Sequence, residues 1–430
     1  MDRRSFLRNT AAAAAAPLSA SAASAAGARL PSERLRVAVI GVRGRGRSHV
    51  KGFSASPDSV VTTICDTDLN VVGKALKIVE EAGGPKPKVV QDLRRVMDDK
   101  DIDLVSIATP DHWHALAAIW ACQAGKDVYV EKPVSHNISE GRRIVEAARK
   151  YDRIVQTGTQ SRSEVDMQEA MKFLHEGGIG KIYMAKALCY KRRKSIGRVP
   201  DSPVPEGLDY NLWLGPAPER PFNANRLHYQ WHWFWDYGTT DMGNQGIHQM
   251  DIARWGLGKS ELPRKIHCAG AKFQYDDDQE TPNTQVTTFE YDDALLVFEV
   301  RGLLTNDEKG VTVGNIFYGT EGYVTMGRHG WKAFMGEKGE PGPGSKPAPD
   351  GESHFQNFLN AVKSRERSVL NAEILEGHLS SALCHLGNIS YRTGRKLTFD
   401  SAWENFPGDD EANSYLTRRY RKPFVVPESV

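Results

Sequence analysis

Residues 35–50 read LRVAVIGVRGRGRSHV, and this stretch decides the first half of the fold. The run 35–40 is short and apolar, which is typical of a strand buried on both faces of a parallel sheet. Similar runs follow, each separated from the next by a segment with helical periodicity, at 60–66, 103–109, 127–130 and 153–159. The alternation predicts an α/β fold that begins with a Rossmann-type, doubly wound parallel sheet.

The turn after the first strand suits the pyrophosphate of a dinucleotide. Its glycines follow the spacing G-x-x-G-x-G, which lets the backbone approach phosphates at the start of the next helix. Asp66 lies 25 residues after Gly41, at a strand end, where a carboxylate can accept a hydrogen bond from a ribose 2′-OH. We predict NAD as cofactor, with NADP as the less favoured alternative and an ordinary strand–helix turn as the competing interpretation. The predicted contacts are Gly41, Arg43, Gly44, Arg45, Gly46 and Asp66.

Two polar clusters follow later strands, at the edge where a doubly wound sheet binds ligands. One is TPDHWH at 109–114 and the other is Glu131-Lys132-Pro133. A lysine that leaves a buried strand into a cleft can hydrogen-bond a reacting oxygen. Histidines spaced as in the first cluster rarely chelate a metal alone, so we predict no metal site. The predicted cofactor contacts here are Thr109, Pro110, His112, His114, Glu131, Lys132 and Gln160.

ATPDHWH followed by VYVEKP, after a glycine turn and an acidic strand end, resembles the Gfo/Idh/MocA oxidoreductase family. The resemblance covers residues 34–400. It implies a cofactor domain followed by an α/β domain with a large, mainly antiparallel open sheet. It also implies that Lys132 lies beside the nicotinamide and the substrate, that the Lys132–Pro133 bond is cis, and that the protein forms a homodimer or homotetramer.

The pattern of the sequence changes after the predicted strand at 153–159. Longer segments that alternate apolar and polar residues, with short turns between them, predict mostly antiparallel pairing. We place the cofactor domain at 34–158, the substrate and oligomerisation domain at 159–400, and a C-terminal extension at 401–430.

The stretch 226–256 holds the main candidates for substrate chemistry. Asp241, Asn244, His248 and Asp251 are spaced three, four and three residues apart, so they share one face if the segment is helical. The resemblance implies an Asp four residues before a catalytic His, and Asn244 stands in that place. Asp241 is the nearest carboxylate that could supply the missing charge. We assign Lys132, His248, Asn244 and Asp241 to catalysis, with His248 as the general base.

Six of the nine residues from Tyr229 to Tyr237 are aromatic. Aromatic rings stack on the C–H faces of sugars, although core packing or a dimer seam would use the same side chains. The basic run 191–198 is either a solvated loop or a clamp for an acidic substrate. The predicted substrate contacts are Arg162, Trp233, Tyr237 and Asp251.

Residues 1–26 read as an address. Arg3 and Arg4 precede a mild Ala-rich run, a pattern that resembles a twin-arginine signal and predicts recognition by that export machinery and a periplasmic location. The formal net charge of +2 arises entirely in this leader. The pathway exports folded proteins, often with cofactor inside, which would explain five dispersed cysteines without disulfide or zinc spacing.

The balanced charge argues against nucleic acid as a partner, and no apolar run long enough for a membrane anchor is present. The leading prediction is an exported NAD(P)-dependent oxidoreductase that transfers a hydride between a tightly bound nicotinamide cofactor and a sugar, polyol or sugar derivative. One alternative is an NAD-dependent glycoside hydrolase that oxidises the sugar transiently and eliminates the aglycone. Another is a non-catalytic sugar-binding relic, suggested by Asn244.

Overall fold

The first sheet has six parallel strands in the order β3-β2-β1-β4-β5-β6. Their bounds are β1 Leu35–Ile40, β2 Ser59–Cys65, β3 Lys88–Val90, β4 Leu104–Ile107, β5 Asp127–Val130 and β6 Val155–Thr157. The strand order reverses between β1 and β4, which is where sheets of this kind bind ligands. Strand β3 was not predicted, because it has only three residues and begins on an exposed lysine. The computed structural model describes residues 34–345 and 353–430, so the export signal assigned to 1–26 lies outside the described residues.

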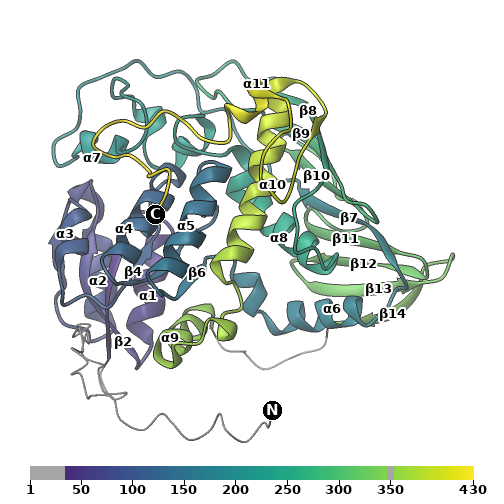
Figure 1. The fold of residues 1–430 in the computed structure, drawn as a ribbon, viewed down its shortest axis with the longest axis horizontal. Coiled ribbons are helices and arrows are strands. Elements are labelled where there is room, and N and C mark those ends of the chain that lie inside the picture. Colours follow the sequence, from purple (N-terminus) through teal and green to yellow (C-terminus); the bar gives the residue numbers. More distant parts are fainter. Residues whose placement is uncertain (1–33, 346–352) are drawn as a thin grey trace, which may run out of the picture. The chain divides into compact units, whose positions relative to one another are not determined.

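Helices cover both faces of this sheet (Figure 1). Val37 and Val39 of β1 point to the side of α1 (Gly46–Ala55) and α2 (Gly73–Glu81). Ala38 and Ile40 point to the opposite side, which packs against three further helices. These are α3 Arg94–Asp98, α4 Asp111–Gln123 and α5 Ile138–Lys150. Because both faces are buried, the central strands β1 and β4 consist mostly of apolar residues, as the sequence indicated.

The second sheet has nine strands in the order β14-β13-β12-β11-β7-β10-β9-β8-β15. Neighbouring strands are antiparallel except β7 and β10, which are parallel. The bounds are β7 Ile182–Cys189, β8 Lys265–Ala271, β9 Thr284–Glu290, β10 Leu295–Arg301, β11 Val313–Gly319, β12 Gly322–Gly327, β13 Gly330–Met335, β14 Glu340–Gly344 and β15 Leu397–Thr398. The predicted fold class, a Rossmann domain followed by a large, mainly antiparallel sheet, is therefore confirmed.

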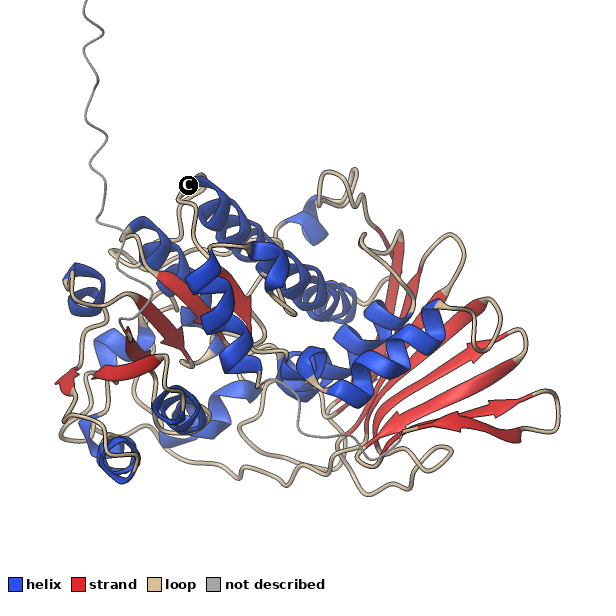
Figure 2. Cartoon of the chain, turned by 90° about the horizontal axis from the view of Figure 1, so that it is seen from below, coloured by secondary structure: helices blue, strands red, loops and turns tan. Residues whose placement is uncertain are grey.

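Three helices pack on one face of the large sheet: α6 (Val165–His175), α8 (Ile247–Gly256) and α10 (Ile374–Thr393), as Figures 1 and 2 show. A π-helical turn, η5 (Met242–Gly246), runs directly into α8. A Cβ on Gly246 would lie 2.1 Å from the ring of Phe298, so glycine lets this turn approach the sheet closely. The segment that carries the predicted catalytic residues is thus helical, as expected, but its first turn is wider than an α-helix.

The remaining helical elements connect the two sheets and cover their ends. They are α7 Tyr210–Leu214, α9 His354–Ser364, α11 Asp410–Asn413, η1 Leu69–Val71, η2 Gln160–Ser163, η3 Ala224–Arg226, η4 His228–Trp233 and η6 Arg367–Val369. Residues 34–430 pack as one compact unit, because α9 and the chain end return to the first sheet. Within the described part of the chain, no helix combines the length and apolar character needed to cross a membrane.

Candidate active site

A cleft lies between the carboxyl edge of the first sheet and the segment 227–232 that includes η4. The first sheet and its loops contribute Gly41, Arg43, Gly44, Arg45, Asp66, Thr109, Pro110, Asp111, His114, Glu131 and Lys132. The opposite wall contributes Leu227, His228, Tyr229, Trp231 and His232. Most of the predicted cofactor contacts therefore meet in one place.

The glycine loop has the shape that a dinucleotide pyrophosphate needs. Gly41 has a φ of 83°, and a Cβ there would lie 2.7 Å from the carbonyl oxygen of Ala108. A Cβ on Gly46 would collide with the Gly41 carbonyl, whereas a Cβ on Gly44 would meet nothing within 4 Å. Helix α1 begins at Gly46 without a side-chain cap, and its Arg47 and Ser48 N–H groups donate to the main-chain oxygens of Gly44 and Arg45.

Asp66 lies at the end of β2 and lines the same cleft. Its Oδ2 accepts a hydrogen bond from the Val42 N–H at 2.7 Å, and its Oδ1 accepts one from the Asp68 N–H at 3.0 Å. Burial raises the pKa of Asp66 to about 6, although these two N–H groups oppose the shift. The bonds fix the carboxylate at the position expected for a ribose contact.

Glu131 orients Arg45 of the glycine loop. Its Oε1 accepts hydrogen bonds from Arg45 Nε at 2.8 Å and from His49 Nε2 at 3.0 Å. Burial alone would raise the pKa of Glu131, but His49 and Arg45 hold it well below its usual value. The Arg45 guanidinium also donates to Gln160 Oε1 at 3.5 Å. Three residues predicted separately as cofactor contacts thus form one connected group.

Lys132 connects the first domain to the π-helical turn. Its Nζ donates to the main-chain oxygen of Asn244 at 2.7 Å. The Lys132–Pro133 bond is cis, which confirms that expectation. The Asn244 side chain donates to Asp241 Oδ1 at 3.2 Å, and Asp241 is itself ion-paired with Arg193 at 2.6 Å. Asn244 therefore meets Lys132 through its backbone, and the Asp241 charge is engaged by Arg193.

His248 lies in the first turn of α8 and is half-buried. Burial, followed by the nearby charge of Lys132, lowers its pKa to about 3, so its ring is neutral at ordinary pH. It does not belong to the residues that line the cleft.

The TPDHWH segment divides between the cleft and the core. His114 lines the cleft, where its Nδ1 lies 2.6 Å from the Pro133 oxygen and its Nε2 lies 2.8 Å from the Thr109 oxygen. It thereby ties together the ends of β4 and β5. His112 is instead buried, with Nε2 2.9 Å from the main-chain oxygen of Trp213. Its predicted cofactor role has no geometric support.

Four predicted substrate contacts lie away from the cleft. Trp233 and Tyr237 are buried in an apolar cluster with Trp213 and Phe234. These two rings therefore pack in the core, which is the alternative that the sequence left open.

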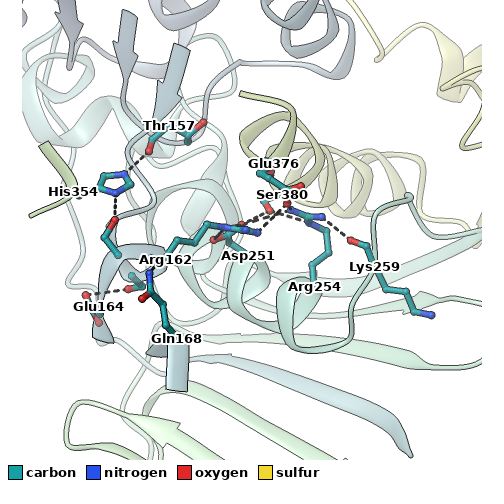
Figure 3. Close-up of polar contacts among 12 residues, drawn as sticks. Thr157, Arg162, Glu164, Gln168, Asp251, Arg254, Lys259, His354, Glu376 and Ser380 are labelled. Carbon is teal, nitrogen blue, oxygen red and sulfur yellow. Dashed lines mark hydrogen bonds and ion pairs between the residues drawn. The ribbon is translucent and has the colours of Figure 1, made fainter. Parts of the chain in front are cut away.

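Arg162 and Asp251 form a buried ion pair at 2.8 Å (Figure 3). Ser380 donates to Asp251 at 2.6 Å, and Glu376 binds both Arg162 and Arg254. Burial would raise the pKa of Asp251, but the two arginines lower it. This network joins elements instead of facing a ligand.

Several cleft residues escaped the sequence analysis. The sequence pattern assigns no role to Asp111 or His232, and it predicts Tyr229 and Trp231 only as members of the aromatic run. The available signal was the aromatic run itself, whose first half lines the cleft while its second half is buried. In the described ranges, no group of three or more His, Cys, Asp or Glu side chains is arranged to hold a metal ion.

The cleft and its two sheets define an oxidoreductase with an NAD-binding domain. The oxidoreductase-family NAD-binding Rossmann fold matches residues 35–159, and the oxidoreductase-family C-terminal alpha/beta domain matches residues 190–426. The chain therefore belongs to the Gfo/Idh/MocA oxidoreductase family.

Solved structures share the fold over most of the chain. The WlbA dehydrogenase from Bordetella pertussis, in complex with NADH and UDP-GlcNAcA, is 20% identical with a TM-score of 0.62, covering 86% of this chain and 99% of that one. A levoglucosan dehydrogenase in complex with NADH and levoglucosan is 18% identical with a TM-score of 0.64, covering 85% and 99%. At these identities the likeness concerns the fold.

Curated relatives match a shorter part. A glycosyl hydrolase family 109 protein from Saccharopolyspora erythraea is 30% identical over 201 residues, which are 42% of this chain and 44% of the relative. An alpha-N-acetylgalactosaminidase from Shewanella oneidensis is 37% identical over 145 residues, 33% of this chain and 32% of the relative. The chain thus spans less than half the length of these curated relatives.

Proposed function

We propose that the protein is an NAD-dependent oxidoreductase acting on a CH–OH group of a sugar, polyol or sugar derivative. The observation that carries the proposal is the cleft itself, in which Lys132 and the dinucleotide loop face a wall of aromatic and histidine side chains. Such a wall offers apolar faces for the ring of a carbohydrate and polar tips for its hydroxyl groups.

The chain supplies the groups that the reaction needs. When bound, NAD provides the nicotinamide that exchanges a hydride with the substrate. Lys132 Nζ donates one hydrogen bond to Asn244, and an ammonium group has two further donors for the oxygen of the reacting carbinol. We keep His248 as the proposed general base for the hydroxyl proton, because its ring is neutral and lies close enough to Lys132 for the ammonium charge to lower its pKa, although it does not line the cleft.

In the first step of the test, the purified protein is denatured and any cofactor that it releases is identified. Free sugars and polyols are then screened for a change in nicotinamide absorbance. Lys132→Met and His248→Gln should keep NAD affinity and lower hydride transfer by roughly 10²–10⁴-fold. Lys172→Met, on the exposed side of α6, is the matched control and should behave as the wild type. Full turnover in both active-site variants would contradict the assignment.

A second candidate function is glycoside hydrolysis by transient oxidation and elimination, favoured by the 30–37% identical relatives with hydrolase names. The same cleft would serve, because oxidising a ring hydroxyl acidifies the neighbouring C–H. Chromogenic glycosides separate the two functions. Aglycone release without net cofactor reduction indicates the hydrolase, and net reduction by free sugar indicates the dehydrogenase. Bound cofactor with neither outcome would favour the sugar-binding relic.

We further propose export to the periplasm by the twin-arginine pathway. The support is the pair Arg3-Arg4 and the five cysteines, all of them free and buried, as expected for a protein folded before export. Replacing Arg3 and Arg4 by lysine should leave the protein in the cytoplasmic fraction, with wild-type protein in the periplasmic fraction.

The proposed assembly is a homodimer or homotetramer through the face of the large sheet that lies opposite its helices. Val286 of β9 points to that face and is 42% exposed. Light scattering after size exclusion should give two or four chains per particle, and a Val286→Glu variant should dissociate.

A further inference from the structure

The hydrogen-bonding role of His232 is fixed by its surroundings. Its Nδ1 lies 2.6 Å from the main-chain oxygen of Tyr229. A carbonyl oxygen can only accept, so Nδ1 carries the ring proton. Burial lowers the pKa of His232 to about 3, which keeps the ring neutral. The other nitrogen, Nε2, therefore carries a lone pair and can act only as an acceptor.

The ring is also held in one orientation. It stacks on Trp231 with a centroid distance of 3.6 Å and an interplanar angle of 20°. Its backbone is packed so tightly against Gly238 that a Cβ there would lie 2.6 Å from the His232 Cα. A rigid ring presents its lone pair in a defined direction, which is what selective recognition needs.

The acceptor has no described protein partner. His232 is 9% exposed, and none of the hydrogen bonds in the described part of the chain ends on Nε2. The ring lines the cleft together with His114 and Lys132, and the positive charge of Lys132 acts on it. The partner of Nε2 therefore comes from whatever fills the cleft.

We propose that His232 recognises a second hydroxyl group of the substrate, next to the one that reacts at Lys132. The inference rests on the proposed function and narrows its substrate class to carbohydrates with two neighbouring free hydroxyls. Because Nε2 of His232 can only accept a hydrogen bond, the substrate group that it binds must be a donor. A deoxy carbon or a methyl ether at that position leaves Nε2 without its donor inside the filled cleft, and such a loss discriminates between substrates.

The experiment compares a substrate with its monodeoxy and mono-O-methyl analogues, using kcat/KM with NAD. In the wild type, removing or methylating one hydroxyl other than the reacting one should lower kcat/KM by roughly 10–100-fold relative to the parent sugar. His232→Phe should lower kcat/KM for the parent sugar by a similar factor and abolish the discrimination at that position. His232→Gln, whose amide oxygen keeps an acceptor, should restore part of both. His267→Phe, on the exposed side of β8, is the matched control.

The outcomes separate this inference from the proposed function. NAD titration and circular dichroism establish that each variant is folded, and the Gln variant carries the test if the Phe variant does not fold. Wild-type turnover together with undiminished discrimination in the His232 variants would overturn the role of His232 alone. A wild-type protein that oxidises no carbohydrate would overturn the proposed function and this inference with it.

Discussion

At the scale of single residues, the carboxyl group of Asp111 links α4, at the edge of the cleft, to the segment that leads into η5. Its Oδ2 accepts a hydrogen bond from Thr239 Oγ1 at 2.7 Å. Burial raises its pKa from 3.8 to about 7, although Thr239 and the charge of Lys132 both oppose the shift. A raised pKa means that the folded state holds the proton more tightly than the unfolded state. The stability that Asp111 contributes is therefore complete below pH 3.8 and is lost as the pH rises through about 7.

Asp111→Asn keeps an acceptor for Thr239 but cannot ionise. We expect the melting temperature of the cofactor-free variant to rise relative to that of the wild type as the pH increases from 4 to 8. Scanning calorimetry at both pH values measures the difference. Asp98→Asn, whose side chain is 72% exposed on α3, is the control. A difference between Asp111→Asn and wild type that does not change with pH would contradict the assignment.

We expect Asp66 to decide between NAD and NADP. Its carboxylate is fixed by two backbone N–H groups at the edge of the cleft, where a 2′-phosphate would meet its negative charge. Asp66→Ser should raise the ratio of NADP to NAD affinity by about tenfold or more, because the repulsion is removed. Fluorescence titration with each reduced cofactor gives the ratio, and Asp98→Ser should leave it unchanged. An unaltered ratio in Asp66→Ser would assign the discrimination to other residues.

At the scale of elements, the sequence predicts those residues whose positions depend only on the strand that precedes them. The glycine turn, Asp66 and Lys132 each follow directly from a strand, so their positions could be predicted from the sequence. His232 and Trp233 are adjacent in the sequence and both are buried, but His232 lines the cleft whereas Trp233 packs in an apolar cluster. Their separation depends on how the short helix η4 packs against distant residues, which spacing alone does not encode.

The same distinction applies to Arg162 and Asp251, which place η2, α8 and α10 against one another (Figure 3). Asp251→Asn would remove the buried one of the two carboxylates that Arg162 and Arg254 share, leaving only Glu376, and should lower the free energy of unfolding by roughly 3–5 kcal/mol. Urea unfolding measures this loss, and Arg162→Met combined with Asp251→Asn should recover part of it. If Asp251→Asn left the stability unchanged but raised the KM for the sugar, Asp251 would be a substrate contact, as the sequence predicted.

At the scale of the whole molecule, the C-terminal segment packs against the first domain. After the large sheet, the chain returns across α4, and the C-terminus lies beside the first domain (Figure 1). Arg421 donates to the main-chain oxygens of Asn211 and Gly215, and Phe424 packs on Trp113 of α4. Helix α4 is buried along nearly its whole length between the first sheet, α5 and this segment. The extension at 401–430 is thus part of the fold that supports the cofactor cleft.

Phe424 tests this dependence. Its side chain is 1% exposed, and its ring centroid lies 5.4 Å from that of Trp113. Phe424→Ala should lower the free energy of unfolding by roughly 3–5 kcal/mol, because it opens a cavity against α4. Val425→Ala, at a neighbouring residue that is 42% exposed, should change it by less than about 0.5 kcal/mol. If the extension supports the cleft, NAD should also bind more weakly to Phe424→Ala near its unfolding midpoint. If Phe424→Ala and Val425→Ala were equally stable, the first domain would not depend on the extension at 401–430 for its stability.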